Sequence, residues 1–160
     1  RSRLISEEDM VKQASEFAGT VPVRHLLPYW KTGNRYLFSG GSVNMRDAAV
    51  YAKEENWSKA VELWKQTYET KKGKQKMYAA YNTALGYEMQ DSIDTALEWA
   101  LKAQTLAREK SKTDKKETGE IHDGTISYYI FISMYVDELE KRKEGMARLN
   151  MQMNRFDDDF

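Results

Sequence analysis

The feature that most constrains the fold of this chain is a pattern of residues that occurs twice, 36 residues apart. The same residue types stand at the same spacing in both copies, Ala48, Tyr51, Ala60 and Glu62 in the first and Ala84, Tyr87, Ala96 and Glu98 in the second. Small residues at these spacings on two successive helices let the helices approach closely, and the tyrosine fills the space beside them. A helix–turn–helix unit of this kind buries its apolar face only by stacking on a neighbour. The pattern therefore predicts a mainly α-helical chain of stacked helix pairs.

Apolar spacing and capping residues place two such units in residues 43–110. The predicted helices cover about residues 43–54, 58–70, 75–89 and 92–109. Their period resembles that of the tetratricopeptide repeat, which is about 34 residues, and the lysine-rich connector 71–76 absorbs the excess. Trp64 takes the large-residue position of an outer helix. We therefore expect Trp64 to be buried between the two helix pairs.

The last part of the chain carries a second pattern, a stripe of residues spaced alternately three and four positions apart. Its members are Ile132, Tyr135, Leu139, Arg142, Met146, Leu149, Met153 and Phe156. Only Arg142 is charged, so the stripe predicts one long helix over about 120–155. This helix makes up the C-terminal capping segment, residues 118–156. Its first half is expected to cap the apolar face that a terminal repeat leaves open. The second half needs another burial partner, either a predicted N-terminal helix or a second molecule in a weak dimer.

Residues 1–42 precede the repeats and combine a short helix with irregular parts. Apolar spacing predicts a helix over about 7–18, two prolines make 20–28 extended, and 27–38 is expected to form a small β-hairpin. A glycine pair then marks a flexible joint at 39–42. Residues 110–119 are predicted to be a solvated loop or a frayed helix end, and the acidic run 157–159 to be disordered.

Length and composition exclude several classes of protein. At 160 residues the chain is long enough for a single domain with a real core. The formal net charge is zero and no aromatic residue is interleaved with the lysine-rich connectors, so we expect no nucleic-acid partner. The absence of cysteine from this sequence excludes disulfides and thiol catalysis within it. The longest apolar run, around Ile126 to Val136, is too short to span a bilayer.

The sequence shows no arrangement of residues that is typical of a catalytic or metal site. His25 and His122 are the only histidines, and neither stands in a nucleophile motif. Glu120, His122 and Asp123 do not share one helical face, so we expect no metal site. The pair Gly40-Gly41 lacks the Lys-Ser/Thr that follows in a phosphate-binding loop. We therefore expect neither enzyme activity nor a cofactor.

The resemblance to tetratricopeptide repeats implies a concave groove, which the first helix of each pair lines in such proteins. The corresponding candidate binding residues are Met45, Arg46, Ala49 and Lys53 on one helix and Tyr78, Tyr81, Asn82, Leu85 and Met89 on the other. Asn82 matches the asparagine with which peptide-binding repeats hold a ligand backbone, because an amide donates and accepts at once. We expect its amide to face the groove without intramolecular partners. Alternatively, Tyr78 and Tyr81 pack against the final helix and Asn82 meets only water.

Peptide-binding repeats also place lysine and asparagine in the preceding repeat, where this chain has Met45 and Ala49. A clamp for a C-terminal carboxylate is therefore not expected. The apolar candidates are expected to anchor a peptide or partner helix by shape, while Asn82 orients its backbone. These anchors are Tyr78, Tyr81, Leu85 and Met89.

Several phrases of the sequence resemble an uncharacterised family of tetratricopeptide-like lipoproteins from Bacteroidetes-type bacteria. They are Asn34-Arg35-Tyr36, Asn56-Trp57-Ser58-Lys59-Ala60 with Trp64, Tyr81-Asn82-Thr83-Ala84-Leu85 with Tyr87-Glu88-Met89, and Tyr135 with Leu139-Glu140 and Arg142. The resemblance covers about residues 12–152. It implies export to the periplasm or outer membrane, with a separate domain and a lipid anchor upstream of Arg1. It implies no biochemical activity.

Three functions are open at this point. The first is a non-catalytic protein–protein interaction scaffold that binds a peptide or partner helix in the concave groove. The second is glycan binding, in which Tyr29, Trp30 and Tyr36 would stack on sugar faces. The third is a purely structural or dimerising role for an upstream domain. An apolar groove would favour the first, and exposed coplanar rings outside it the second.

Overall fold

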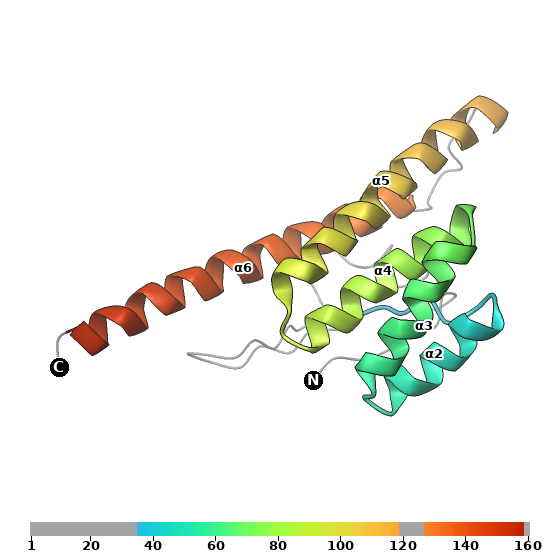
Figure 1. Ribbon diagram of the computed structural model, residues 1–160. Coiled ribbons are helices and arrows are strands. Elements are labelled where there is room, and N and C mark those ends of the chain that lie inside the picture. Colours follow the sequence, from blue (N-terminus) through green and yellow to red (C-terminus); the bar gives the residue numbers. More distant parts are fainter. Residues whose placement is uncertain (1–34, 119–126, 159–160) are drawn as a thin grey trace.

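The structure is a computed structural model that describes residues 35–118 and 127–158, with the backbone alone for 114–118 and 158. These residues form helices α2 (Val43–Lys53), α3 (Trp57–Thr70), α4 (Gly73–Met89), α5 (Ile93–Thr118) and α6 (Tyr128–Asp158) (Figure 1). The prediction of a mainly helical chain is confirmed for them. The predicted helix over 7–18 and most of the predicted hairpin lie outside the described residues. The last hairpin residues, 35–38, have no regular secondary structure.

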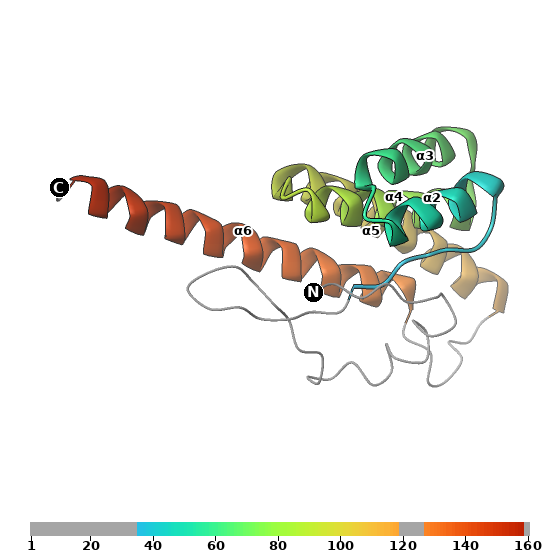
Figure 2. The ribbon, with the colours of Figure 1, turned by 90° about the horizontal axis from the view of Figure 1, so that it is seen from below.

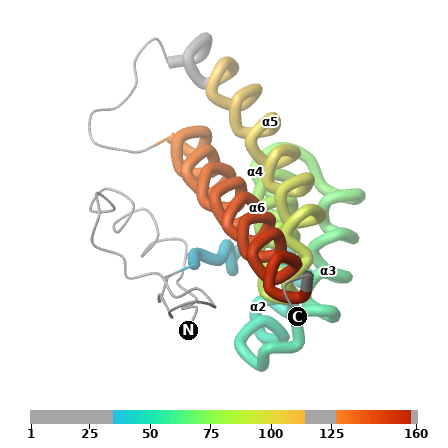
Figure 3. The backbone as a smooth tube through the Cα atoms, turned by 90° about the vertical axis from the view of Figure 1, so that its left-hand side faces the viewer, coloured from blue at the N-terminus to red at the C-terminus, as the bar shows by residue number. Residues whose placement is uncertain are grey.

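Each helix packs on the next one in the chain, α2 on α3, α3 on α4, α4 on α5 and α5 on α6 (Figures 1 and 3). We call α2–α5 the array, and α4 packs between α3 and α5 within it. Every residue from Met77 to Gly86 is buried, because α3 and α5 flank the helix and other segments cover its remaining faces.

The repeat seen in the sequence has a counterpart in the backbone. Glu55, in the turn between α2 and α3, has a positive φ of 61°. Asp91, 36 residues later in the turn between α4 and α5, has φ 60°. The backbone N–H that follows each of them donates to a tyrosine carbonyl, Asn56 to Tyr51 at 2.8 Å and Ser92 to Tyr87 at 2.9 Å. The same turn therefore joins α2 to α3 and α4 to α5.

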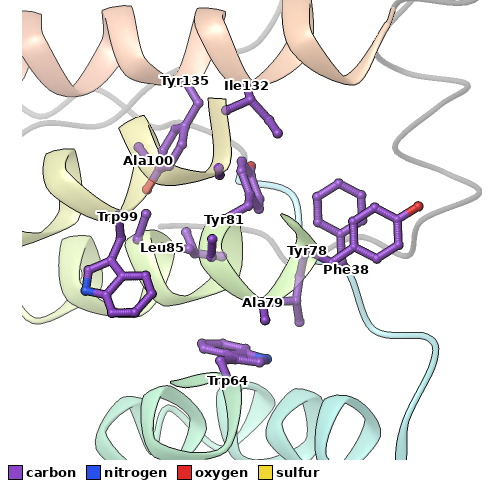
Figure 4. Packing of buried hydrophobic residues seen from close by; sticks show 14 of the residues in the cluster. Phe38, Trp64, Tyr78, Ala79, Tyr81, Leu85, Trp99, Ala100, Ile132 and Tyr135 are labelled. Carbon is purple, nitrogen blue, oxygen red and sulfur yellow. The ribbon is translucent and has the colours of Figure 1, made fainter. Parts of the chain in front are cut away.

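Trp64 is fully buried, as predicted, at the contact between α3 and α4 (Figure 4). The contact is close because Gly86 of α4 has no side chain. A Cβ at Gly86 would overlap Val61 and lie 3.2 Å from Cζ3 of the Trp64 ring. The tight approach that small residues predicted is thus present, with Gly86 as its closest point.

Two helix boundaries differ from the sequence prediction. α5 continues to Thr118 instead of ending near Glu109, so the loop interpretation of 110–118 is wrong. Lysine and glutamate favour helix, and the first glycine after Ile93 is Gly119. α6 begins at Tyr128 rather than near residue 120. Ser127 caps its N-terminus, because the Ser127 hydroxyl accepts from the backbone N–H of Ile130 at 3.3 Å. Its helix also includes Asp157, which was predicted to be disordered.

The two halves of α6 have different surroundings. The first half packs on the array, as predicted, and buries Phe131, Ile132, Tyr135, Val136 and Leu139. The second half projects beyond the other helices (Figures 1 and 2). None of the helices in the described ranges is both long and apolar enough to cross a membrane.

Candidate functional site: an occupied groove

The chain's own residues 35–38, which we call the docked segment, pack against α4 on the side that the repeat analogy assigned to a groove. All four of its residues are buried. The Phe38 ring stacks on Tyr78 of α4 with a centroid distance of 4.0 Å and meets Tyr81 edge-on at 5.2 Å (Figure 4). From α6, Phe131 lies 5.3 Å from the Tyr36 ring. The docked segment therefore lies between α4 and α6, in an aromatic box.

Asn82 holds the backbone of the docked segment at two points. Its Oδ1 accepts from the backbone N–H of Phe38 at 3.1 Å, and its Nδ2 donates to the Phe38 carbonyl at 2.7 Å. Asn82 is fully buried. The prediction that its amide lacks intramolecular partners is therefore wrong, and so is the alternative that it meets only water. The expected chemistry, one amide pairing with one peptide unit, is present, but the peptide belongs to the same chain.

Glu88 is buried at the other end of the docked segment and accepts three hydrogen bonds. Arg35 Nε donates to its Oε1 at 2.8 Å, Arg142 of α6 donates to the same oxygen at 3.0 Å, and the Tyr135 hydroxyl donates to Oε2 at 2.6 Å. Charge-assisted bonds to a buried carboxylate are stronger than neutral ones. One side chain of α4 thereby ties the docked segment and α6 together.

The titration of the site follows from this burial. Burial raises the pKa of the Tyr135 phenol well above its usual 10.0, and the adjacent Glu88 carboxylate raises it further. Burial likewise raises the pKa of Tyr81, and the nearby Arg35 opposes this effect. For Arg35, burial alone lowers the pKa, but Glu88, Tyr135 and Tyr81 together outweigh it and the net shift is upward. Arg35 is thus held as a cation and both phenols as neutral donors at ordinary pH.

The other predicted groove residues do not share one open face. Met45, Ala49 and Leu85 are buried, Met89 is half-buried, and Arg46 and Lys53 are exposed. Tyr78 and Tyr81 pack against the final helix, Tyr78 on Tyr128 at 5.6 Å and Tyr81 on Tyr135 at 5.0 Å. The alternative interpretation of these two tyrosines is therefore confirmed, because α6 and the docked segment cover the surface that the repeat analogy left open.

The glycan hypothesis loses one of its three rings. Tyr36 is buried, with 4% of its surface exposed, so its ring does not offer a face to a sugar. Tyr29 and Trp30 lie outside the described residues, as do Glu120, His122 and Asp123. Within the described ranges no three His, Cys, Asp or Glu side chains gather as metal ligands.

Sequence reasoning missed the roles of Glu88 and Arg35. A signal was present in Arg142, the one charge in an otherwise apolar stripe. A cation at a seam position needs a buried counter-charge, and Glu88 supplies it from α4. Arg35 gave no such signal, since its contact to Glu88 spans 53 residues of chain.

The space left around the docked segment is small. A cavity of about 30 Å³ lies beside Arg35 and Tyr36, closed by Tyr81, Tyr135 and Phe131 together with Met134 and Glu138. A single water occupies about this volume. A larger, shallow hollow of about 610 Å³ lies on α3, lined mainly by its exposed polar residues. The space beside the docked segment, between α4 and α6, is therefore much smaller than a peptide.

Two families of proteins match parts of the chain. Residues 46–141 match the family described as a domain of unknown function, DUF6340, and residues 1–38 match another, DUF8603. No curated protein and no solved structure matches the chain. The second match ends at Phe38, the last residue of the docked segment, and the first begins within α2. Because residues 46–141 make up more than half of the 160 residues, the chain belongs to the DUF6340 family.

Proposed function

We propose that this domain is a non-catalytic protein–protein interaction scaffold of the tetratricopeptide-like type, whose concave face holds an irregular peptide segment. The observation that carries the proposal is the paired hydrogen bonding of Asn82 with the backbone N–H and carbonyl of Phe38. A side chain that reads a peptide unit, beside an aromatic box for one ring, is the chemistry of a peptide-binding groove.

The tetratricopeptide-like part of the proposal is supported by the repeated turn. Glu55 and Asp91 share an unusual backbone conformation, and the hydrogen bonds that follow them are equivalent. The most extensive helix contacts are those between neighbours in the chain, which is also typical of repeat arrays.

The proposed ligand of the groove is the end of the region that precedes the array. Residues 1–38 match a separate family, and their last four residues are the docked segment. The array would then act as a platform that fixes this neighbouring region in place. The groove recognises it at three points, the Arg35 cation by Glu88, the Phe38 backbone by Asn82 and the Phe38 ring by Tyr78.

The cellular setting is part of the proposal and is supported by the resemblance to envelope lipoproteins alone. It places the domain in the periplasm or at the outer membrane, attached through a lipid anchor on an upstream part of a larger protein.

A complementation experiment tests the groove as a peptide site. In the full chain, the double variant Arg35→Ala, Phe38→Ala removes the charge and the ring from the docked segment but leaves α4 and α6 unchanged. A synthetic peptide with the natural sequence of residues 31–40 is expected to raise the melting temperature of this variant, because ligand binding to the folded state stabilises it.

The matched controls are the unaltered chain, whose groove is occupied, and the same double variant with Asn82→Ala, which lacks the backbone contact. Neither is expected to respond to the peptide. If the double variant also fails to respond at millimolar peptide, residues 35–38 are ordinary core and the groove is not a peptide site.

A further inference from the structure

The projecting half of α6 carries an apolar stripe on a helix that has left the body of the domain. Met146, Met153 and Phe156 are 43%, 57% and 66% exposed, and Leu149 is half-buried. These four residues continue the heptad whose earlier members are buried against the array. Arg142 separates the two parts, because its guanidinium turns to Glu88. A helix in water does not keep an apolar stripe without a partner that covers it.

Charges are distributed unevenly along the same half-helix. Residues 141–143 are Lys, Arg and Lys, at the point where α6 leaves the array, and residues 157–159 are all Asp. Lys143 Nζ lies 2.9 Å from Oδ1 of Asp94 in its own chain, but its side chain is 56% exposed and can also meet a second carboxylate. The apolar stripe lies between these two runs of opposite charge. A parallel pair of such helices would put like charges side by side, whereas an antiparallel pair puts each basic run beside an acidic one.

We propose that the projecting half of α6 pairs with the same half of a second copy of this chain, antiparallel, with the twofold axis between Asn150 and Gln152. In this register Met146 faces Phe156 of the second copy and Leu149 faces its Met153. Lys143 lies opposite Asp157 of the second copy, and the two Asn150 side chains lie on either side of the twofold axis. The apolar stripe of each copy is then covered by the stripe of the other copy, and each basic run lies beside an acidic run.

The shape of the molecule leaves room for this pairing. The second half of α6 extends well clear of α2, α3 and α4 in two perpendicular views (Figures 1 and 2). In an antiparallel pair the two arrays lie at opposite ends of the paired helices. The contact is short, about three helical turns, and smaller than the interfaces of permanent dimers. We expect a weak dimer that forms as the protein concentration rises.

The first test is the molar mass of the full chain by sedimentation equilibrium over a range of concentrations. The mass is expected to rise from that of a monomer toward twice that value. Met146→Asp with Leu149→Asp should raise the dissociation constant more than about tenfold, since two buried apolar side chains per copy become charged. The matched control is Met151→Asp. Met151 follows Leu149 by two residues, is 60% exposed and lies outside the apolar stripe. A monomeric mass at every concentration, or equal effects of the two changes, overturns the proposal.

The second test fixes the orientation. The chain contains no cysteine, so Asn150→Cys introduces a single thiol. A short bismaleimide should link two copies of this variant, because the antiparallel register puts the two copies of position 150 on the same side of the seam. A parallel pair would put them on opposite sides of it. Met151→Cys serves as the outward-facing control and should remain unlinked.

Charge reversal gives an independent check that leaves the apolar stripe intact. Asp157→Lys should weaken dimerisation, because it places a lysine opposite Lys143 of the second copy. Mixing this variant with a Lys143→Glu chain should restore pairing between unlike copies. If Asn150→Cys is not linked or the mixed chains fail to pair, the antiparallel arrangement is wrong.

Discussion

Glu88 shows how much of the site depends on one side chain. It is the one buried acidic residue in the described part of the chain, with 3% of its side chain exposed, and it serves Arg35, Arg142 and Tyr135 at once. Removing one member of a buried ion pair is costly because the remaining charge stays in a poorly solvated place. The position of the docked segment relative to α6 therefore depends on this carboxylate.

Glu88→Gln is expected to lower the free energy of unfolding by about 3 kcal/mol, because the two arginines keep their burial but lose their counter-charge. The measurement is urea unfolding followed by circular dichroism. Glu138→Gln is the matched control, since Glu138 is more exposed and lies 4.0 Å from Arg35. It should change stability by less than about 1 kcal/mol. Equal losses in the two variants would contradict the central role of Glu88.

At the scale of helices, the contact between α3 and α4 is set by the absence of a side chain at Gly86. In α6, by contrast, a Cβ added at Gly145 would have no neighbour within 4 Å. Both glycines cost a helix the same free energy through their low helix propensity, but only Gly86 is closely packed. Substituting each by alanine therefore distinguishes the effect of helix propensity from the effect of packing.

Gly86→Ala is expected to destabilise the protein, because the new methyl group overlaps Val61 and crowds the Trp64 ring. Gly145→Ala is expected to stabilise it by up to about 1 kcal/mol, since alanine favours helix and nothing obstructs it. Chemical denaturation of the two variants gives both values. A stabilising Gly86→Ala would show that α3 and α4 are less tightly packed than described.

The helices that the sequence pattern predicted well are those with strong periodicity and clear caps. The turns at Glu55 and Asp91 follow the repeat, and Trp64 is buried as the small residues around it required. The end of α5 was less predictable, because residues 110–118 mix helix-favouring lysine and glutamate with serine, threonine and aspartate and have no apolar face.

Over the whole molecule, the groove could not be predicted as occupied because its contents come from far along the chain. The repeat analogy expected Asn82 to bind the backbone of a separate ligand, whereas its partner is Phe38 of the same chain, 44 residues earlier. One feature did point that way. The middle of α4 is apolar or small all round, and such a helix is covered on every side rather than open on one.

The buried phenols make the stability of the molecule sensitive to alkali. The pKa values of Tyr36, Tyr81 and Tyr135 are all raised from 10.0 by burial. In the unfolded chain these phenols lose protons near pH 10, while in the folded protein they keep them, so the stability is intact below that pH and falls above it. Each contributes a slope of at most about 1.4 kcal/mol per pH unit.

The measurement is the free energy of unfolding from pH 8 to pH 11. Tyr135→Phe should show a shallower decline above pH 10 than the unaltered chain, because one of the three linked protons is gone. A profile that stays flat to pH 11, or an unchanged slope in Tyr135→Phe, would contradict this account.

The burial of the docked segment also determines the order in which the chain assembles. The Trp64 contact joins helices that follow each other directly, whereas Asn82 and Glu88 bind residues 44 to 54 positions away. Contacts between distant residues form late, since closing long loops costs entropy. Trp64→Ala should therefore slow refolding, whereas Asn82→Ala should mainly speed unfolding, as stopped-flow kinetics would reveal. During synthesis Phe38 leaves the ribosome before α4 and α6. The docked segment is therefore present when these two helices form and pack around it.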